Sequence, residues 1–186
     1  MANICDTTYI IHADDTKALK EVHSILEELK EKNSRIQVYD FLQKLGYSQL
    51  ALTDCRGEIY NFEYDETDDG LTIDVDSSWN RLEGIEDALY DFLGWDSTSI
   101  IYASEELGCD IFETNDYSGS FFSLKYYYFS SDDESEYLDG EQELVDYVKD
   151  FYDKEVCSNE QEAFDYVESH STDENGNPTI YKREII

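Results

Sequence analysis

The chain has 186 residues and a formal net charge of −32, which arises from 45 acidic and 13 basic residues. This balance excludes binding to nucleic acid or to membranes through a basic surface of the chain's own, because both kinds of binding depend on Lys and Arg, and it favours basic protein surfaces as partners. Hydrophobic residues make up 40% of the chain, which is enough to bury a core, so we expect an ordered, soluble protein.

The start of the chain predicts a strand followed by a helix. Residues 4–12 are rich in β-branched residues and Tyr, which favours a strand. Apolar residues then recur every three or four positions from Leu19 to Leu29, as in an amphipathic helix. The polar face of this helix mixes Lys and Glu, and residues 1–35 hold 7 acids and 5 bases. This segment is therefore predicted to be the least acidic part of the molecule.

A short helix and a hairpin follow. The apolar spacing over 38–45 predicts a helix that ends at Gly46. Residues 57–63 and 71–75 alternate apolar and polar side chains, and the turn residues at 68–70 lie between them. The sequence therefore predicts two antiparallel strands joined by a tight turn.

The middle of the chain predicts a further helix and three strands. Apolar spacing over 82–93 indicates a helix that ends at Gly94, and residues 98–103 read as a strand. A turn and a strand follow by residue 112. Residues 120–130 give the strongest strand signal in the chain, with apolar side chains on both faces, so this strand is expected to lie centrally or to be covered on both sides.

The composition changes after Ser131. Residues 132–168 hold 15 acids and 2 bases, yet apolar spacing still predicts a helix around 144–152. A second helix begins at Ser158 or Asn159, with Glu162 placed to complete a capping box. A short strand is expected over 179–185.

This order of elements predicts an α+β fold. We expect residues 1–130 to form a ferredoxin-like core, that is, a mainly antiparallel sheet with helices on one face. Residues 131–186 are expected to form an acidic helical extension with a terminal strand, packed on that core.

Three segments carry a resemblance to a family. Residues 1–10 (MANICDTTYI), 77–79 (SSW) and 101–109 (IYASEELGC) resemble the YubB-like ferredoxin-like proteins of plasmids and phages. The resemblance is patchy over residues 1–130, and it departs from the family at 80–81, where prolines are usual, and at Asp110, where Gly is usual. It implies a ferredoxin-like fold and an origin in a mobile genetic element, and it implies no activity.

No catalytic or metal-ligating residue is predicted. Residues 173–184 carry oxygen-bearing side chains at the positions of a calcium loop, but Pro178 stands where that loop requires Gly, so an Asx-rich turn is favoured. The cysteines lie far apart, and no His or Cys pair has ligand spacing. Cys109, after Gly108, is the cysteine that an unrecognised nucleophilic site would use, but its acidic neighbours disfavour a thiolate. We expect no cofactor.

The Tyr126–Tyr128 run and the chain's start allow two further expectations. A tyrosine run can stack on single-stranded nucleic acid, but such platforms lie in basic grooves and only Lys125 is near, so packing in a core or on a sheet is favoured.

The chain has no apolar run of 18 residues and no signal-type start, which predicts a cytoplasmic protein.

The acidity is dense enough to imitate nucleic acid only where it is clustered. Spread evenly over about 9,000 Å² of surface, the net charge gives about one charge per 290 Å², against about one per 110 Å² for duplex DNA. If most acids share half of the surface, the two densities match. The mixed charge of residues 1–35 and the acidity of residues 132–168 favour such an asymmetry.

We therefore predict a non-enzymatic acidic binding protein of a mobile genetic element, which docks a negative face into a basic groove of a nucleic-acid-handling protein and inhibits it as a DNA mimic. Two alternatives stay open: a structural or regulatory interaction module that binds through aromatic residues, and an enzyme with an unrecognised carboxylate or Cys site. The residues predicted to bind the partner are Asp132, Asp133, Glu134, Glu136, Asp139, Glu141, Glu143, Asp146, Asp150, Asp153, Glu160, Glu162 and Asp165.

Overall fold

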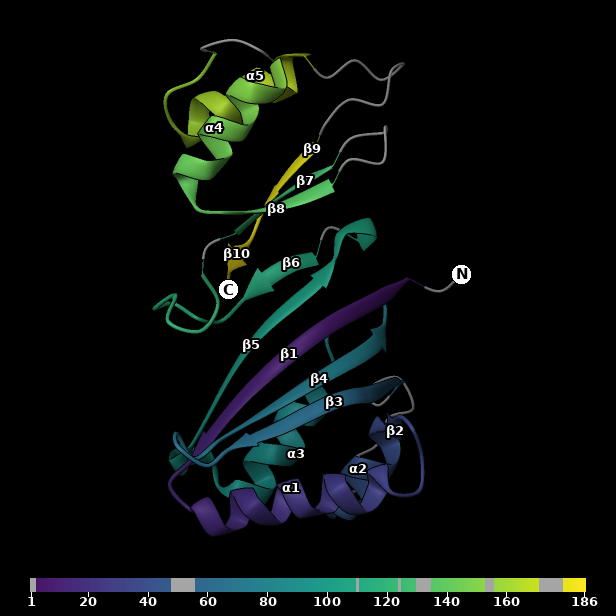
Figure 1. Cartoon of the computed structure of the whole chain (residues 1–186). Helices are drawn as coiled ribbons and strands as arrows, with labels where there is room; N and C mark the ends of the chain where they lie inside the picture. The colour runs from purple at the N-terminus through teal and green to yellow at the C-terminus, as the bar shows by residue number, and fades with distance from the viewer. Residues whose placement is uncertain are drawn as a thin grey trace. The chain divides into compact units, whose positions relative to one another are not determined.

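A computed structural model describes residues 3–47, 56–109, 111–123, 125–129, 135–152, 156–170 and 179–186. The fold is mixed α+β, as the sequence predicts, and its sheets are mainly antiparallel (Figure 1). The chain divides into two compact units, Met1–Asp116 with Ile186 (unit 1) and Tyr117–Ile185 (unit 2). This division precedes residue 130, and the domain organisation expected from the composition stays a prediction.

Unit 1 is one sheet with helices on one of its faces (Figure 1). Within unit 1 the strand order is β6-β5-β1-β4-β3-β2. The elements of unit 1, in chain order, are β1 (Ile4–Ala13), α1 (Thr16–Lys30), β2 (Ile36–Gln37), α2 (Val38–Lys44), β3 (Gly57–Asp65), β4 (Gly70–Ser78), α3 (Glu83–Leu93), β5 (Thr98–Glu106) and β6 (Ile111–Thr114), with short 3-10 turns at Trp95–Ser97 and Leu107–Cys109.

The two faces of this sheet differ because side chains alternate along each strand. In β1, Tyr9 and Ile11 point into the core and are fully buried, and in β4 the same holds for Leu71 and Ile73. The helices fill the other side of this core with their apolar faces, through Leu19, Val22, Leu26, Ile85 and Leu89. The opposite sheet face carries charged residues of these strands, among them Asp6, Asp74 and Asp76.

Local signals in the sequence fix the ends of these helices. The Asp15 carboxylate accepts hydrogen bonds from the backbone N–H groups of Lys17 (3.1 Å) and Ala18 (3.0 Å), which caps the start of α1. Gly46 and Gly94 follow α2 and α3 with φ of 80° and 100°, in the left-handed region that glycine adopts without strain. The predicted helix ends at these two glycines are confirmed.

Unit 2 packs two helices on a small sheet. The strand order is β8-β7-β9, so β7 lies centrally as predicted. The helices cover one face, where fully buried Tyr126 and Tyr128 meet Leu144 and Val148. The elements are β7 (Lys125–Phe129), β8 (Ser135–Asp139), α4 (Glu141–Tyr152), α5 (Glu160–His170), β9 (Thr179–Lys182) and β10 (Glu184–Ile185).

The strand predicted over residues 120–130 is too long. Gly119 has a φ of 64°, and the Ser118 hydroxyl accepts a hydrogen bond from the Ser120 backbone N–H (3.1 Å), so the chain turns at this point. Phe121 is 42% exposed rather than packed in the sheet. The strand begins at Lys125, where its pairing with β8 begins, and its pairing with β9 begins at Tyr126.

Replacing Asn159 by Ala is expected to lower the free energy of unfolding by about 1 kcal/mol. The Asn159 side chain accepts a hydrogen bond from the backbone N–H of Glu162 (3.0 Å), and Glu162 in turn accepts one from the backbone N–H of Ser158 (2.8 Å). The predicted cap is thus present, with the return bond going to Ser158 rather than to Asn159. Urea unfolding of the variant measures the loss. Asn159→Asp, which keeps the acceptor, should cost much less.

A half-buried arginine joins α3 to the sheet. The side chain of Arg81 is 17% exposed and forms ion pairs with Glu86, with Glu83 (3.7 Å) and with Glu113 on β6 (3.8 Å). Its guanidinium carbon lies 4.1 Å from the centre of the Tyr102 ring. Three carboxylates of unit 1 thus share the Arg81 cation.

Stability is expected to rise as the pH falls from about 7 to about 5. Burial raises the pKa of the Glu86 carboxyl, and repulsion from Glu83 and Asp87 adds to this effect, while Arg81 partly offsets it. Because the folded pKa is raised, the folded state binds the proton more tightly than the unfolded state, and stability is lost as the pH rises through the folded pKa. Proton uptake also reduces the repulsion within the chain.

At still lower pH the trend should reverse. Hydrogen bonds from Thr67 and Ser158 lower the pKa values of Asp65 and Glu162, respectively, so their contributions are lost as the pH falls through those folded pKa values. Urea unfolding at a series of pH values measures both the rise in stability and its loss at lower pH. Glu86→Gln should show a smaller rise between about pH 7 and about pH 5. An identical rise in the variant would exclude Glu86 as a cause.

Candidate protein-interaction surface

The acidic residues of α4 and α5 point away from the core of unit 2. In α4 the buried positions are Leu144, Val145 and Val148, and in α5 they are Ala163 and Val167. The exposed positions between them carry carboxylates. We call the following set the α4–α5 surface: Glu141, Glu143, Asp146, Asp150, Glu162 and Asp165, all of them exposed.

Two carboxylates of this surface are held in place by neutral donors. Gln142 donates a side-chain hydrogen bond to Asp146 (2.9 Å), and Gln161 donates one to Asp165 (2.8 Å). Each donor lies four residues before its acid, where a Lys would form an ion pair. Because glutamine is neutral, these contacts orient the carboxylates without cancelling their charge.

Three further carboxylates bind backbone donors. Glu141 accepts from the Glu160 N–H (3.0 Å), which ties α4 to the start of α5, and Glu143 accepts from the Asp139 N–H (2.5 Å). Glu162 accepts from the Ser158 N–H and from its hydroxyl (2.7 Å), and these bonds lower the pKa of Glu162. Negative charge at a helix start is favourable. Lys125 and Lys182 of unit 2 form their ion pairs with Asp139 and Glu160, which lie outside the α4–α5 surface.

Two predicted residues are neutralised instead. Asp139 lies 3.5 Å from the Lys125 ammonium, and Glu160 lies 2.5 Å from that of Lys182. Partial burial raises the pKa of Glu160, but hydrogen bonds from Lys182 and Tyr126 outweigh this effect and lower it. These two acids therefore add little net charge to the surface.

The remaining predicted residues lie elsewhere. Glu136 is exposed on β8, opposite Tyr128 of β7. Asp132, Asp133, Glu134 and Asp153 lie outside the described residues.

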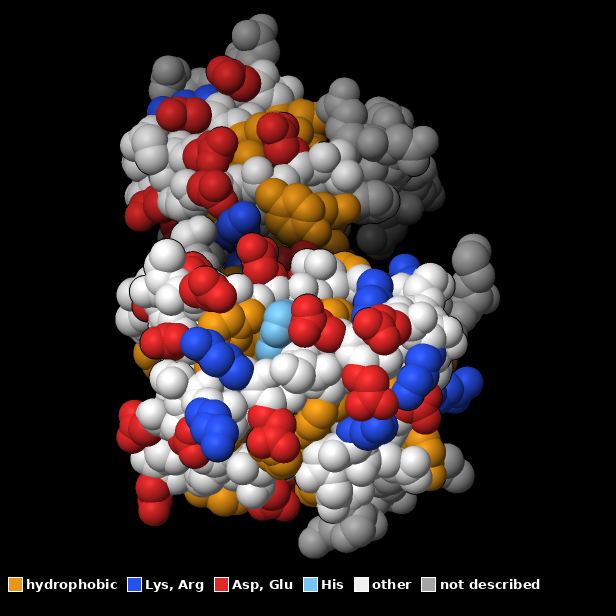
Figure 2. All heavy atoms as spheres, turned by 60° about the horizontal axis from the view of Figure 1, so that its bottom comes forward, with side chains coloured by type: hydrophobic (Ala, Val, Ile, Leu, Met, Phe, Trp, Pro, Cys, Tyr) orange, Lys and Arg blue, Asp and Glu red, His pale blue; other side chains and the backbone are white. Residues whose placement is uncertain are grey.

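The carboxylate spacing along α4 approaches that of a DNA strand. Glu143, Asp146 and Asp150 lie three and four residues apart, so they follow one stripe of the helix. With a rise of about 1.5 Å per residue, the stripe holds a carboxylate about every 5 Å, against a phosphate about every 3.4 Å along one DNA strand. On the part of unit 2 shown in Figure 2, Asp and Glu lie with some Lys and Arg among them, and on the helical face of unit 1 Lys and Arg alternate with Asp and Glu.

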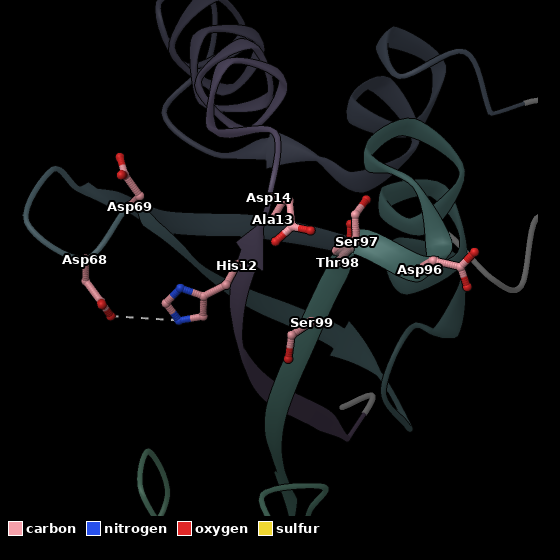
Figure 3. Close-up of a pocket in the computed structure, with 9 residues that line it drawn as sticks. All are labelled: His12, Ala13, Asp14, Asp68, Asp69, Asp96, Ser97, Thr98 and Ser99. Atoms are coloured by element: carbon pink, nitrogen blue, oxygen red, sulfur yellow. Dashed lines mark ion pairs between the residues drawn. The ribbon is translucent and has the colours of Figure 1, made fainter.

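A hollow at one end of the unit 1 sheet contains His12 (Figure 3). It has a volume of about 350 Å³ and is lined mainly by aspartates and hydroxyl residues. Asp68 points toward His12 with a separation of 3.9 Å, whereas Asp69 and Asp96 point away from it. Asp69 and Asp96 therefore do not join the pair of His12 and Asp68.

The cysteines and the other histidines are also dispersed. Cys5 and Cys157 are buried, half-exposed Cys109 accepts a hydrogen bond from the Asn3 amide (3.3 Å), and Cys55 lies outside the described residues. The His170 ring stacks on the Tyr166 ring, with 4.0 Å between the ring centres. Among the side chains that the structure describes, no group of three or more His, Cys, Asp or Glu could hold a metal ion.

Two other expectations concern the tyrosine run and the C-terminal segment. Tyr126 and Tyr128 lie in the core. Tyr127 packs on the other sheet face, where the centre of its ring lies 4.9 Å from that of Tyr137 and 6.3 Å from that of Tyr181. These positions confirm the predicted packing of the tyrosine run on a sheet. The turn predicted around residues 173–178 lies outside the described residues. No helix within the described ranges combines the length and the apolar character needed to span a membrane.

The surface that the sequence analysis missed lies on unit 1. Asp6, Asp76 and Glu58 meet across three strands on the sheet face opposite the helices. The alternation Ile73-Asp74-Val75-Asp76 signalled that β4 carries acids on one face. The sequence held no signal for the strand order that brings these acids together.

Comparisons of the chain with protein-family models, with curated proteins and with solved structures found no match.

Proposed function

We propose that this chain is a non-enzymatic acidic protein that docks the α4–α5 surface into a basic groove of a nucleic-acid-handling protein, as an inhibitor of the DNA-mimic type. The observation that carries the proposal is the pairing of Asp146 and Asp165 with glutamines rather than with lysines. Their charges are kept in fixed positions and remain available to a partner.

Electrostatics explains how such a surface would act. A net charge of −32 attracts a basic partner over distances of about a Debye length, close to 10 Å at moderate salt. This attraction speeds encounter, and the affinity falls as salt screens it. The same charge repels the nucleic acid that the partner normally binds.

The proposal includes a family and an origin. The order β1, α1, β3, β4, α3, β5 agrees with the βαββαβ pattern of a ferredoxin-like plait, with α2 and β2 as additions, and residues 131–186 would be its acidic extension. Together with the resemblance of residues 1–10 and 101–109, this pattern supports a YubB-like, ferredoxin-like protein of a plasmid or phage. Such a protein would act in the cytoplasm of its host.

Affinity capture tests this function. The tagged protein is incubated with a lysate of the host cell and eluted in steps from about 0.05 M to about 0.5 M salt. A nucleic-acid-handling protein should elute at moderate salt, and the variant Asp146→Asn/Asp150→Asn/Asp165→Asn should fail to retain it. A partner that elutes without regard to salt, and that the variant retains, would overturn the proposal.

A further inference from the structure

A row of carboxylates crosses the unit 1 sheet on the face opposite the helices. Asp6 on β1 lies directly opposite Asp76 on β4, and Asp76 lies directly opposite Glu58 on β3. Directly opposed side chains on one face lie about 5 Å apart, and like charges at such positions are destabilising. Only the Glu58 and Asp76 end of this row carries a cation within the described residues, and Asp6 has none.

That cation shows how the row binds a guanidinium group. Arg35 donates to Asp76 (2.6 Å) and lies 3.4 Å from Glu58. Its guanidinium carbon also lies 5.7 Å from the centre of the Tyr60 ring. The Tyr60 hydroxyl in turn donates to Asp6 (3.0 Å), so that the ring lies between the bound guanidinium and the next carboxylate.

Apolar side chains are exposed beside the row. Ile4, two residues before Asp6 on the same face of β1, is 60% exposed. Trp79, directly after β4, is 54% exposed, and its backbone N–H donates to the Asn3 carbonyl (3.3 Å), which places its backbone next to the start of β1. A hollow of about 300 Å³ lies beside Ile4 at the Glu58 and Asp76 end of the row, and both Arg35 and Arg56 line it.

The backbone of Trp79 is also strained. Its φ is 78°, in the left-handed region that costs a bulky residue free energy and that proteins retain mainly at functional positions. Tryptophan is one of the residue types enriched at the energetic centres of protein interfaces. An exposed apolar side chain thus follows directly after the strand that carries Asp76.

We propose that this sheet face binds a protein segment that presents an arginine, with the guanidinium at Asp6 beside Tyr60 and an apolar neighbour against Ile4 and Trp79. Arginine suits the site better than lysine, because a planar guanidinium can bind carboxylates in a fork and stack on an aromatic ring at once. This surface belongs to unit 1, and the proposal does not depend on the α4–α5 surface.

Tryptophan fluorescence provides the test. The chain has two tryptophans, and Trp95→Phe leaves Trp79 as the reporter while a ring still stacks on Tyr90. Titration with a hexa-arginine peptide should change the Trp79 emission with saturation. Hexa-lysine should bind several-fold more weakly. Asp6→Asn, which keeps the acceptor for Tyr60, should weaken hexa-arginine binding about fivefold or more.

Glu63→Gln is the matched control. Glu63 is exposed on β3, opposite Thr72 on the same sheet face and away from the row, so the net charge changes equally. This variant should change the affinity less than twofold. Equal weakening by both variants, equal affinity for hexa-lysine, or no change in Trp79 emission would each overturn the proposal. Neutralising Asp146, Asp150 and Asp165 tests the α4–α5 surface separately and should leave the Trp79 response in place.

Discussion

Replacing Arg81 by methionine is expected to lower the free energy of unfolding by about 3 kcal/mol, because it leaves the Glu86 carboxylate partly buried without its cation. Glu86 is 16% exposed, and Glu83 and Glu113 also lie within ion-pairing distance of Arg81. The guanidinium stack on Tyr102 would be lost as well. Urea unfolding monitored by circular dichroism measures the change.

Two further variants isolate the cause. Arg81→Met/Glu86→Gln removes both charges and should recover much of the lost stability, because a neutral pair carries no penalty for a buried charge. Arg35→Gln removes a guanidinium that is 50% exposed and should cost less than about 1 kcal/mol. If Arg81→Met cost no more than Arg35→Gln, the buried ion network would not stabilise unit 1.

Neutralising three carboxylates of the α4–α5 surface is expected to weaken the complex with the basic partner about 100-fold at low salt. The variant Asp146→Asn/Asp150→Asn/Asp165→Asn removes three exposed charges, each worth up to about 1 kcal/mol across an interface. Asparagine can still accept the hydrogen bonds from Gln142 and Gln161, so the helices should remain intact. Surface plasmon resonance should show most of the loss in the association rate, since long-range attraction acts on encounter.

A variant of equal charge separates local binding from general attraction. Glu21→Gln/Glu31→Gln/Glu66→Gln removes three exposed acids of unit 1. It should weaken the complex less than about fivefold, through the total charge alone. Equal losses in both triple variants would mean that the partner responds to net charge and does not contact α4 and α5.

Periodicity predicted most of the elements, because each carries its own pattern. The alternation in β1 and β4 and the three- and four-residue spacing in α1 and α3 place buried residues on one side. Strand β8 escaped prediction because Leu138 is its one buried residue and its neighbours are polar or exposed. Its strand conformation comes from pairing with β7, which is a tertiary effect.

The candidate site was predictable to the same degree. Helical periodicity predicted that Asp146, Asp150 and Asp165 are exposed, because the buried positions of α4 and α5 alternate with them. It could not predict that Lys182 neutralises Glu160 from a strand 22 residues later. Nor could it predict the row of Asp6 and its neighbours, because strand register is set by the fold as a whole.

The most direct test of DNA mimicry is competition for the purified partner. Fluorescently labelled duplex DNA is bound to the partner captured by this protein, and the unlabelled protein is added at low salt while anisotropy is followed. The α4–α5 surface should displace the DNA completely, and the triple Asp→Asn variant should need about 100-fold more protein. A stable ternary complex of partner, DNA and protein would contradict the account, because the protein would then bind outside the basic groove.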